Sequence, residues 1–262
     1  MTLAFMKTQC AGRDYIIVNA ADTSATDVTA MARKLCSRHV GVGADGLAVV
    51  EHLGRARFAI RCFRPDGTGS PADGNALRCC ARAIADRYGY RSATLITVGY
   101  AYESCLAGDD IGLRFPALRD ILGPLRVHQR TVYRLWTGAD NLVTFVDDLH
   151  DIDLAAEGPA LRGHPRFGPA GVHVNFAEIR GPGRLRIRTH DREAEAEILS
   201  SGTGSLAAAL LARRLGFCAE NHIDVEAYSG GSLHMHLGDA AQEETWLYGP
   251  VLSVFEGEIP WP

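Results

Sequence analysis

The sequence has no long apolar run, no CxxC motif and no large excess of one charge. Its longest apolar stretches stay far below the roughly 20 residues that a membrane-spanning helix requires. Lysine and arginine total 27 against 31 aspartate and glutamate, a net charge of −4, which argues against nucleic acid or a membrane surface as a partner. The seven cysteines are scattered without a CxxC pair, so neither a disulfide framework nor a structural zinc site is expected.

The first residues, Met1–Lys7, also lack the charged start and the apolar core of a signal peptide. We therefore expect a cytoplasmic protein. Hydrophobic residues make up 47% of the chain and charged residues 22%, which is the balance of a globular protein with a buried core. At 262 residues the chain is long enough for one large domain or two small ones.

Two stretches place glycine and small polar residues directly before a helix-forming run. One is Asp73-Gly74-Asn75, which leads into 76–84, and the other is Ser201-Gly202-Thr203-Gly204, which leads into 205–212. The first N–H groups of a helix have no partner within the helix, and the helix dipole adds positive potential there. Such helix starts bind anions. The candidate carboxylate ligands are Gly74, Asn75, Gly202, Thr203 and Gly204.

The order strand, turn, glycine-rich helix start and helix occurs once in each half of the chain. Residue identity between the halves is low, so the repeat is one of architecture. We predict an α/β fold of two lobes, residues 1–120 and 121–262, with the last strand able to return to the first lobe. Clefts between domains commonly bind ligands, so the active site is expected in the cleft between the lobes.

Hydrophobic periodicity and turn residues predict the individual elements. In the first half we expect a hairpin over 5–18, a helix over 26–37, strands over 47–50 and 58–63, and a helix over 74–88. The middle of the chain, 94–145, is predicted to form strands, and 154–169 a loop or a crossover. In the second half we expect strands over 185–189, 223–227, 233–237 and 244–248, with the second helix ending before Gly216.

Four motifs occur in the same order and at similar separations as in one known family. They are Arg38–Gly46, Pro65-Asp66-Gly67 followed by Gly74–Cys79, Glu197–Gly204, and Tyr248-Gly249-Pro250. Through them the chain resembles the diaminopimelate epimerase family over almost its whole length. The resemblance implies two mirrored lobes, each with mostly antiparallel strands around a central helix. It further implies an isomerase of amino-acid metabolism without pyridoxal phosphate, metal or other cofactor, a small amino acid or carboxylic acid as its binding partner, and a homodimer as one option for its assembly.

The resemblance also implies a two-base site, in which one cysteine precedes each helix start. Here Asp73 and Ser201 stand at those two positions. A carboxylate whose pKa is raised by burial takes up and returns protons, so Asp73 is the predicted acid/base. A serine without a partner base is a poor proton carrier, and Ser201 is left as a catalytic, a substrate-binding or a purely structural residue. Both residues also suit a helix N-cap.

Two arginines replace asparagines that face the substrate in the family. Arg13 lies in the segment Gln9–Asp14, and Arg64 precedes Pro65. Two guanidinium groups at a ligand site favour a substrate with an additional carboxylate or phosphate. The alternative is that both arginines lie on the surface.

Further substrate-binding candidates lie in the second half. Asn141 ends the segment that replaces the family's Gly-Asn-Pro-His, and Asn175 corresponds to an asparagine that the family uses on the distal end of its substrate. Arg192, or Glu193 in an ungapped alignment, stands at the family's Glu-Arg-Gly turn. These departures argue against diaminopimelate as the substrate. His234 and His236 alternate on one predicted strand without acidic or cysteine partners nearby, so no metal site is expected there.

The first functional hypothesis is an epimerase-like isomerase that moves a proton on an amino acid or a related small carboxylic acid. Asp73 acts as acid/base and the two helix N-termini clamp the carboxylate. One base suits transfer along one face, as in a double-bond shift, and relatives similar to the phenazine-pathway isomerase work with a single carboxylate. A lyase, dehydratase or cyclase is one alternative, and a non-catalytic binding protein for small acids is another. The sequence leaves epimerisation, a double-bond shift, elimination and cyclisation open.

Overall fold

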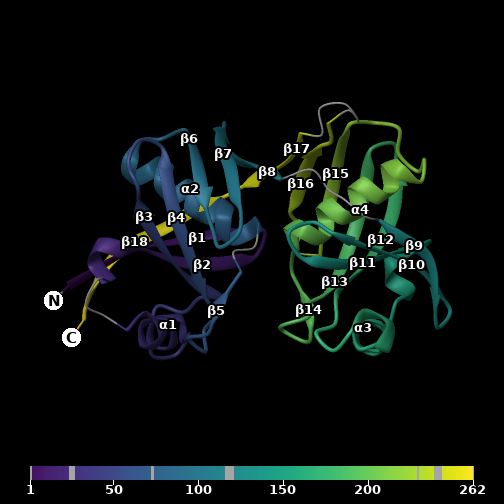
Figure 1. Cartoon of the computed structure of the whole chain (residues 1–262), viewed down its shortest axis with the longest axis horizontal. Coiled ribbons are helices and arrows are strands. Elements are labelled where there is room, and N and C mark those ends of the chain that lie inside the picture. The colour runs from purple at the N-terminus through teal and green to yellow at the C-terminus, as the bar shows by residue number, and fades with distance from the viewer. Residues whose placement is uncertain are drawn as a thin grey trace. The chain divides into compact units, whose positions relative to one another are not determined.

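The structure is a computed structural model that describes residues 2–23, 27–71, 74–115, 121–228, 230–238 and 244–261 (Figure 1). The chain forms two compact units. Unit 1 is Met1–Arg114 together with Gly249–Pro262, and unit 2 is Phe115–Tyr248. Within the described ranges, no helix is both long and apolar enough to cross a membrane.

Unit 1 is built from helices α1 and α2 and from a set of strands at both ends of the chain. The helices are α1 (Val28–Cys36) and α2 (Gly74–Tyr88). The strands are β1 (Thr2–Cys10), β2 (Arg13–Asn19), β3 (Gly46–His52), β4 (Arg57–Phe63), β5 (Gly69–Ser70), β6 (Ser92–Ile96), β7 (Ala101–Ala107), β8 (Asp110–Phe115) and β18 (Leu252–Pro260).

Unit 2 contains helices α3 (Leu154–Arg162) and α4 (Gly202–Arg214). Its strands are β9 (Leu122–Val127), β10 (Arg130–Trp136), β11 (Asp140–Val146), β12 (His173–Gly181), β13 (Arg184–His190), β14 (Glu197–Ile198), β15 (His222–Ala227), β16 (Ser232–His236) and β17 (Thr245–Pro250). Both predicted glycine-rich stretches therefore lead directly into a helix.

The two units repeat one order of elements, which confirms the predicted α/β fold with mostly antiparallel strands. Unit 1 runs β1-β2-α1-β3-β4-β5-α2-β6-β7, and unit 2 runs β10-β11-α3-β12-β13-β14-α4-β15-β16. Among the described residues, the parallel pairs are β2–β3 and β4–β6 in the first unit and β11–β12 and β13–β15 in the second. Parallel neighbours require a crossover connection, and α1, α2, α3 and α4 each lie in one.

The expectation of a loop over 154–169 is wrong for its first half, where α3 forms. The alternative of a crossover is correct, because α3 connects the parallel strands β11 and β12. Asp153 caps the helix by accepting a hydrogen bond from the Ala156 N–H at 3.1 Å. Gly158 is required at its position because a Cβ would lie 2.6 Å from the ring of His190. Pro159 is exposed and lies inside the helix. Proline is unfavourable in a helix interior, so the sequence of this stretch is typical of a loop.

Helices α2 and α4 are central to their units. The first contacts β1, β2, β3, β4, β6, β7 and β18, and the second contacts β11, β12, β13, β15 and β16. Most residues of the two helices are buried, as expected for a helix that is enclosed on several sides. The surrounding strands therefore fix where each helix begins.

Candidate active site

The start of α2 is held by contacts from β1 and from the next turn of the helix. Asp73, the predicted acid/base, lies outside the described residues, and the helix begins at Gly74. The Asn75 Oδ1 accepts a hydrogen bond from Arg78 Nη2 at 2.9 Å, and its carbonyl accepts one from the Cys10 thiol at 3.5 Å. The side chain of Asn75 is thus oriented by Arg78.

Arg78 is the largest fully buried side chain of the described residues. Its Nη2 bonds Asn75 and lies 3.8 Å from the Cys10 sulfur, whereas its Nε and Nη1 have no hydrogen-bond partner among the described residues. Arginine remains charged inside proteins, and buried polar groups without partners are rare in native structures. The start of α2 therefore carries a buried positive charge that no described carboxylate neutralises.

Arg13 opens β2, after a turn in which Ala11 and Gly12 have φ angles of 47° and 81°. Two successive residues with positive φ are typical of the two-residue turns that connect the strands of a β-hairpin. The Nε of Arg13 lies 3.5 Å from Asp45 Oδ2. Arg64 is half-buried in the turn after β4, where its N–H donates to the Thr68 carbonyl at 2.9 Å.

Beside Arg13, Asp14 is the centre of an ion-pair network. Its carboxylate lies 2.8 Å from Lys7 Nζ and accepts two hydrogen bonds from Arg38, at 2.8 and 3.0 Å. The backbone N–H of Asp45 donates to the same carboxylate at 2.8 Å. Burial alone would raise the pKa of Asp14, but the hydrogen bonds from Arg38 and Lys7 outweigh it and hold the pKa well below its ordinary value. The network links β1 and the start of β2, next to Arg13, to the loop that precedes β3.

Asp14→Asn is expected to lower the free energy of unfolding by about 1–2 kcal/mol at pH 7. Because the pKa of Asp14 is depressed in the folded state, its contribution is complete above the unfolded value of about 3.9 and is lost as the pH falls below it. The difference between the variant and the wild type should therefore narrow in urea unfolding measured from pH 5 down to pH 2. Asp109→Asn, at an exposed aspartate in the β7–β8 turn, is the control. A difference that widens in acid would contradict the assignment.

The start of α4 is capped by Ser201. This residue has extended backbone angles, φ −129° and ψ 111°, and its Oγ accepts a hydrogen bond from the Gly204 N–H at 3.0 Å. The Thr203 carbonyl accepts a hydrogen bond from the Thr137 hydroxyl at 2.9 Å. Cys10, the last residue of β1, makes the corresponding contact with the second residue of α2, whereas Thr137 directly follows β10.

Asn141 and Asn175 lie together beneath α4, and both are fully buried. The Asn175 amide donates to Asn141 Oδ1 at 3.0 Å and to the Leu142 carbonyl at 3.1 Å, and its Oδ1 accepts from Thr189 at 2.8 Å. The Asn141 amide donates to Thr137 Oγ1 at 2.9 Å. These hydrogen bonds orient the first residues of α4 from the side of the sheet. They engage both N–H groups of the side-chain amides of Asn141 and Asn175.

Arg192 lies in the loop after β13. Its Nε donates to Glu193 Oε1 at 3.0 Å, and its carbonyl accepts from Arg162 Nε at 3.0 Å. The two residues that compete for the family's arginine position, Arg192 and Glu193, therefore form an ion pair with each other.

The same loop contacts His173, which the sequence reasoning missed. Its Nδ1 lies 3.1 Å from Asp191 Oδ2 and its Nε2 lies 3.4 Å from Glu193 Oε2. Among the described residues, these three form the group of histidine and carboxylate side chains with metal-like spacing. The two carboxylates approach different nitrogens of the His173 ring, and these nitrogens point away from each other. A single metal ion binds one nitrogen of a histidine, so this arrangement does not suit one ion held by all three side chains.

Cys79 does not replace the missing cysteines. It lies fully buried in α2, and burial together with the neighbouring Cys10 thiol raises its pKa well above the ordinary value. A thiol of this kind stays protonated and unreactive.

The histidines on β16 have partners that their sequence neighbourhood does not show. His234 Nδ1 lies 2.7 Å from Asp224 on β15, so the expectation that no acidic residue is nearby is wrong. Strands β15 and β16 are antiparallel neighbours, and residues far apart in sequence stand opposite each other. His236 stacks on His222 with ring centroids 4.3 Å apart.

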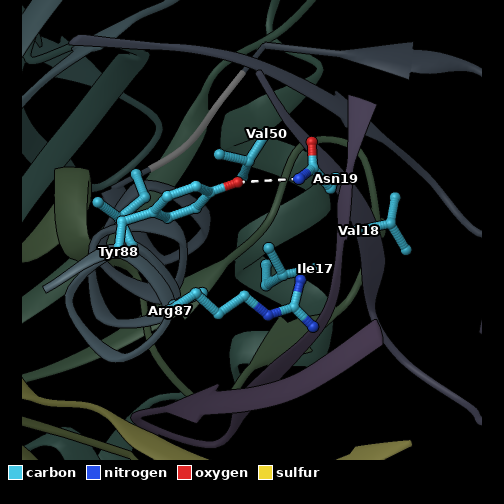
Figure 2. Close-up of a pocket in the computed structure, with 8 residues that line it drawn as sticks. Ile17, Val18, Asn19, Val50, Arg87 and Tyr88 are labelled. Atoms are coloured by element: carbon cyan, nitrogen blue, oxygen red, sulfur yellow. Dashed lines mark hydrogen bonds between the residues drawn. The ribbon is translucent and has the colours of Figure 1, made fainter. Parts of the chain in front are cut away.

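A small pocket of unit 1 lies at the other end of α2 from the candidate site (Figure 2). Its lining includes Ile17, Asn19 and Tyr88, and Asn19 Nδ2 donates to the Tyr88 hydroxyl at 2.9 Å. Tyr88 ends α2 and Gly74 begins it, a distance of about 21 Å along the helix. This pocket has no part in the chemistry of the helix start.

The sequence model of the diaminopimelate epimerase family matches residues 5–99 and 134–254. A diaminopimelate epimerase of Hydrogenobaculum sp. is 30% identical over 290 residues, covering 97% of this chain and 98% of the relative. A PhzF-family phenazine biosynthesis protein of Enterococcus faecalis superposes with a TM-score of 0.73 at 14% identity, covering 100% of both chains. A hydroxyproline epimerase of Agrobacterium vitis superposes with a TM-score of 0.71 at 14% identity, covering 98% of this chain and 92% of the other.

Fold and sequence together define an isomerase of the epimerase class. The chain belongs to the diaminopimelate epimerase family.

Proposed function

We propose that this protein is a cofactor-independent isomerase that moves a proton on an amino acid or a related small carboxylic acid. Asp73 acts as the acid/base. The backbone N–H groups at the starts of α2 and α4 bind the substrate carboxylate and stabilise the charge that develops on it when the neighbouring carbon loses its proton.

The buried charge of Arg78 is the observation that carries this proposal. Among the described residues no carboxylate pairs with Arg78, and an unpaired guanidinium is costly in a protein interior. Arg78 bonds Asn75 in the first turn of α2, so its charge adds to the positive potential of the helix N-terminus. An anionic ligand bound at this helix start is the natural counter-charge.

The lysines support a reaction without pyridoxal phosphate. That cofactor is held as a Schiff base on a lysine, and the chain has two lysines, Lys7 and Lys34. Lys7 is ion-paired with Asp14 and donates to the Gly43 carbonyl. The Lys34 ammonium lies 5.0 Å from the Trp261 ring centroid. Both amines are therefore engaged in structural contacts.

The substrate class follows from the arginine positions. Arg13 and Arg64 replace neutral residues of the family pattern, and guanidinium groups recognise carboxylates and phosphates. A substrate with a second acidic group therefore fits the proposal better than diaminopimelate, whose distal end carries an amine as well as a carboxylate.

Hydrogen–deuterium exchange at carbon tests the proposal. The protein is incubated in D₂O with L-glutamate, L-aspartate, L-proline, trans-4-hydroxy-L-proline, itaconate and L,L-diaminopimelate, and deuterium at carbon is followed by NMR. We expect exchange with at least one of these acids, and Asp73→Asn is expected to slow it by about 10²- to 10⁴-fold. Asp66→Asn, at an exposed aspartate in the preceding turn, is the matched control and should retain the wild-type rate.

The other outcomes separate the alternatives. Binding of an acid without exchange would favour a non-catalytic binding protein. Exchange that survives Asp73→Asn would show that another group is the base. Analysis of the product by chiral chromatography and NMR distinguishes an epimer from a shifted double bond, an elimination product or a ring.

A further inference from the structure

Three histidines gather on one face of the sheet in unit 2. His222 belongs to β15, and His234 and His236 belong to β16. Along both strands the histidines alternate with buried residues, so their side chains share the exposed face of the sheet. Helix α4 contacts the same two strands, and the buried apolar residues of the opposite face are the ones that pack against a helix. The histidines therefore lie on the face away from α4.

The strand register brings the three imidazoles close together. His222 stands directly opposite His236, an arrangement that places two Cβ atoms about 4.5–5.5 Å apart. Their rings stack with centroids 4.3 Å apart. His234 is two positions from His236 on the same face, about 7 Å along the strand, and it is the diagonal neighbour of His222. Imidazoles in such positions are a ligand set that Zn²⁺, Ni²⁺ and Cu²⁺ accept.

His234 also has the second contact that is typical of a metal-bound histidine. Its Nδ1 lies 2.7 Å from Oδ1 of Asp224, the residue opposite it on β15. A carboxylate at one ring nitrogen fixes the tautomer and the orientation of the ring, and it leaves the other nitrogen, Nε2, as the ligand atom. The side chains of His234 and Asp224 are 48% and 54% exposed, so an ion reaches them directly from solvent.

The other two rings need a rotation before their nitrogens converge on one ion, because His222 and His236 lie flat on each other. Exposed side chains change rotamer within picoseconds to nanoseconds, so this rotation is no barrier. On β17, Trp246 stands opposite His236 and Tyr248 opposite His234. The rings of Trp246 and Tyr248 stack with centroids 5.7 Å apart. They line one side of the histidines with apolar surface, which limits the access of water to a bound ion.

We propose that His222, His234 and His236 bind a divalent transition-metal ion, with Asp224 as the residue that orients His234. Zn²⁺ accepts three imidazoles with water in the fourth position, and Cu²⁺ binds the same donors more tightly. The expectation of no metal site at His234 and His236 depends on the absence of partners in the neighbouring sequence, and the pairing of β15 with β16 supplies them. The site lies within unit 2, and the proposed proton transfer makes no use of it.

Calorimetric titration of the untagged protein with ZnCl₂ tests the proposal. We expect one ion to bind at these histidines. His236→Gln removes a ligand and should weaken binding by more than about 100-fold, whereas Asp224→Asn removes only the second contact of His234 and should weaken it by about 10- to 100-fold. His128→Asn is the matched control. His128 is an exposed histidine of the same unit whose ring contacts that of His164, and its loss should leave Zn²⁺ binding unchanged.

Cu²⁺ locates the ion within the chain. Because Trp246 stands beside His236, Cu²⁺ bound at the histidines should quench the fluorescence of this tryptophan. The quenched component should be absent in Trp246→Phe. It should also be absent in His236→Gln, for which a circular dichroism spectrum identical to that of the wild type shows that the variant is folded. Nitrogen hyperfine lines in the electron paramagnetic resonance spectrum should identify imidazoles as the ligands.

Two results would overturn the proposal. One is the absence of Zn²⁺ binding by the wild type. The other is Zn²⁺ binding that persists unchanged in both His222→Gln and His236→Gln, which would place the ion elsewhere in the chain. Unchanged binding in Asp224→Asn alone would remove the orienting role of this carboxylate. The exchange experiment in D₂O is independent of all three results, so failure of the metal site leaves the proposed function intact.

Discussion

Gly204→Ala is expected to lower the free energy of unfolding by about 3–5 kcal/mol. Inside a helix, alanine is normally about 1 kcal/mol more favourable than glycine, so the sign of the effect comes from packing alone. The added Cβ would lie 2.0 Å from Asn175 Oδ1 and 2.9 Å from Ser201 Oγ. Either α4 shifts, or Asn175 turns away and leaves Thr189 and its other partners without a hydrogen bond.

Urea unfolding of a double-mutant cycle measures this effect. Asn175→Ser shortens the obstructing side chain, so Gly204→Ala should cost much less in that background than in the wild type. Gly69→Ala is the control, because a Cβ there meets no atom within 4 Å and the backbone is not in the left-handed region. Equal costs of Gly204→Ala in both backgrounds would show that Asn175 is not the obstacle.

Arg78→Met is expected to stabilise the ligand-free protein by about 2–4 kcal/mol. Methionine fills a similar volume, and the substitution removes a buried charge whose Nε and Nη1 have no partner among the described residues. The loss of the hydrogen bond to Asn75 offsets part of this gain. The same substitution should weaken carboxylate binding at the start of α2, so stability and function move in opposite directions.

Thermal unfolding tests both the gain in stability and the weaker carboxylate binding. It is measured with and without the acid that exchanges fastest among those named for the D₂O experiment. The variant should melt at a higher temperature than the wild type, and the acid should raise its melting temperature by less. Arg82→Met, one helical turn further along, removes a side chain that pairs with Asp86 at 3.0 Å, and it should change stability by about 0.5 kcal/mol or less. A destabilised Arg78→Met whose ligand-induced shift is unchanged would contradict the role assigned to the guanidinium.

The helix starts were predictable because their signals are local. Gly74 and Gly202 begin the helices at the positions that the glycine-rich motifs indicate. Small residues before an apolar run specify a helix N-terminus wherever the rest of the chain goes. The α3 helix was missed for the converse reason. Gly158 and Pro159 are poor helix residues, and the helix is stabilised by packing against β12 and β13.

The supporting residues of the site were only partly predictable. Arg78 could have been found from its spacing, since it stands three positions after Asn75 and residues at this distance meet on a helix surface. His173 and Asn175 likewise share one face of a strand. The loop residues Asp191 and Glu193, however, reach His173 across the β12–β13 pair, and such contacts depend on a register that no local pattern specifies.

The return of the last strand to unit 1 has a consequence for synthesis on the ribosome. Strand β1 pairs with β2 along one edge and with β18 along the other, from Thr2 opposite Pro260 to Gln9 opposite Leu252. All residues of unit 2 precede β18 in the sequence, so they are synthesised before β1 can gain its second neighbour. Until then the outer edge of β1 is unpaired and open to association with other chains. A premature stop before Leu252 would leave a nascent chain with one foldable unit and one permanently exposed strand.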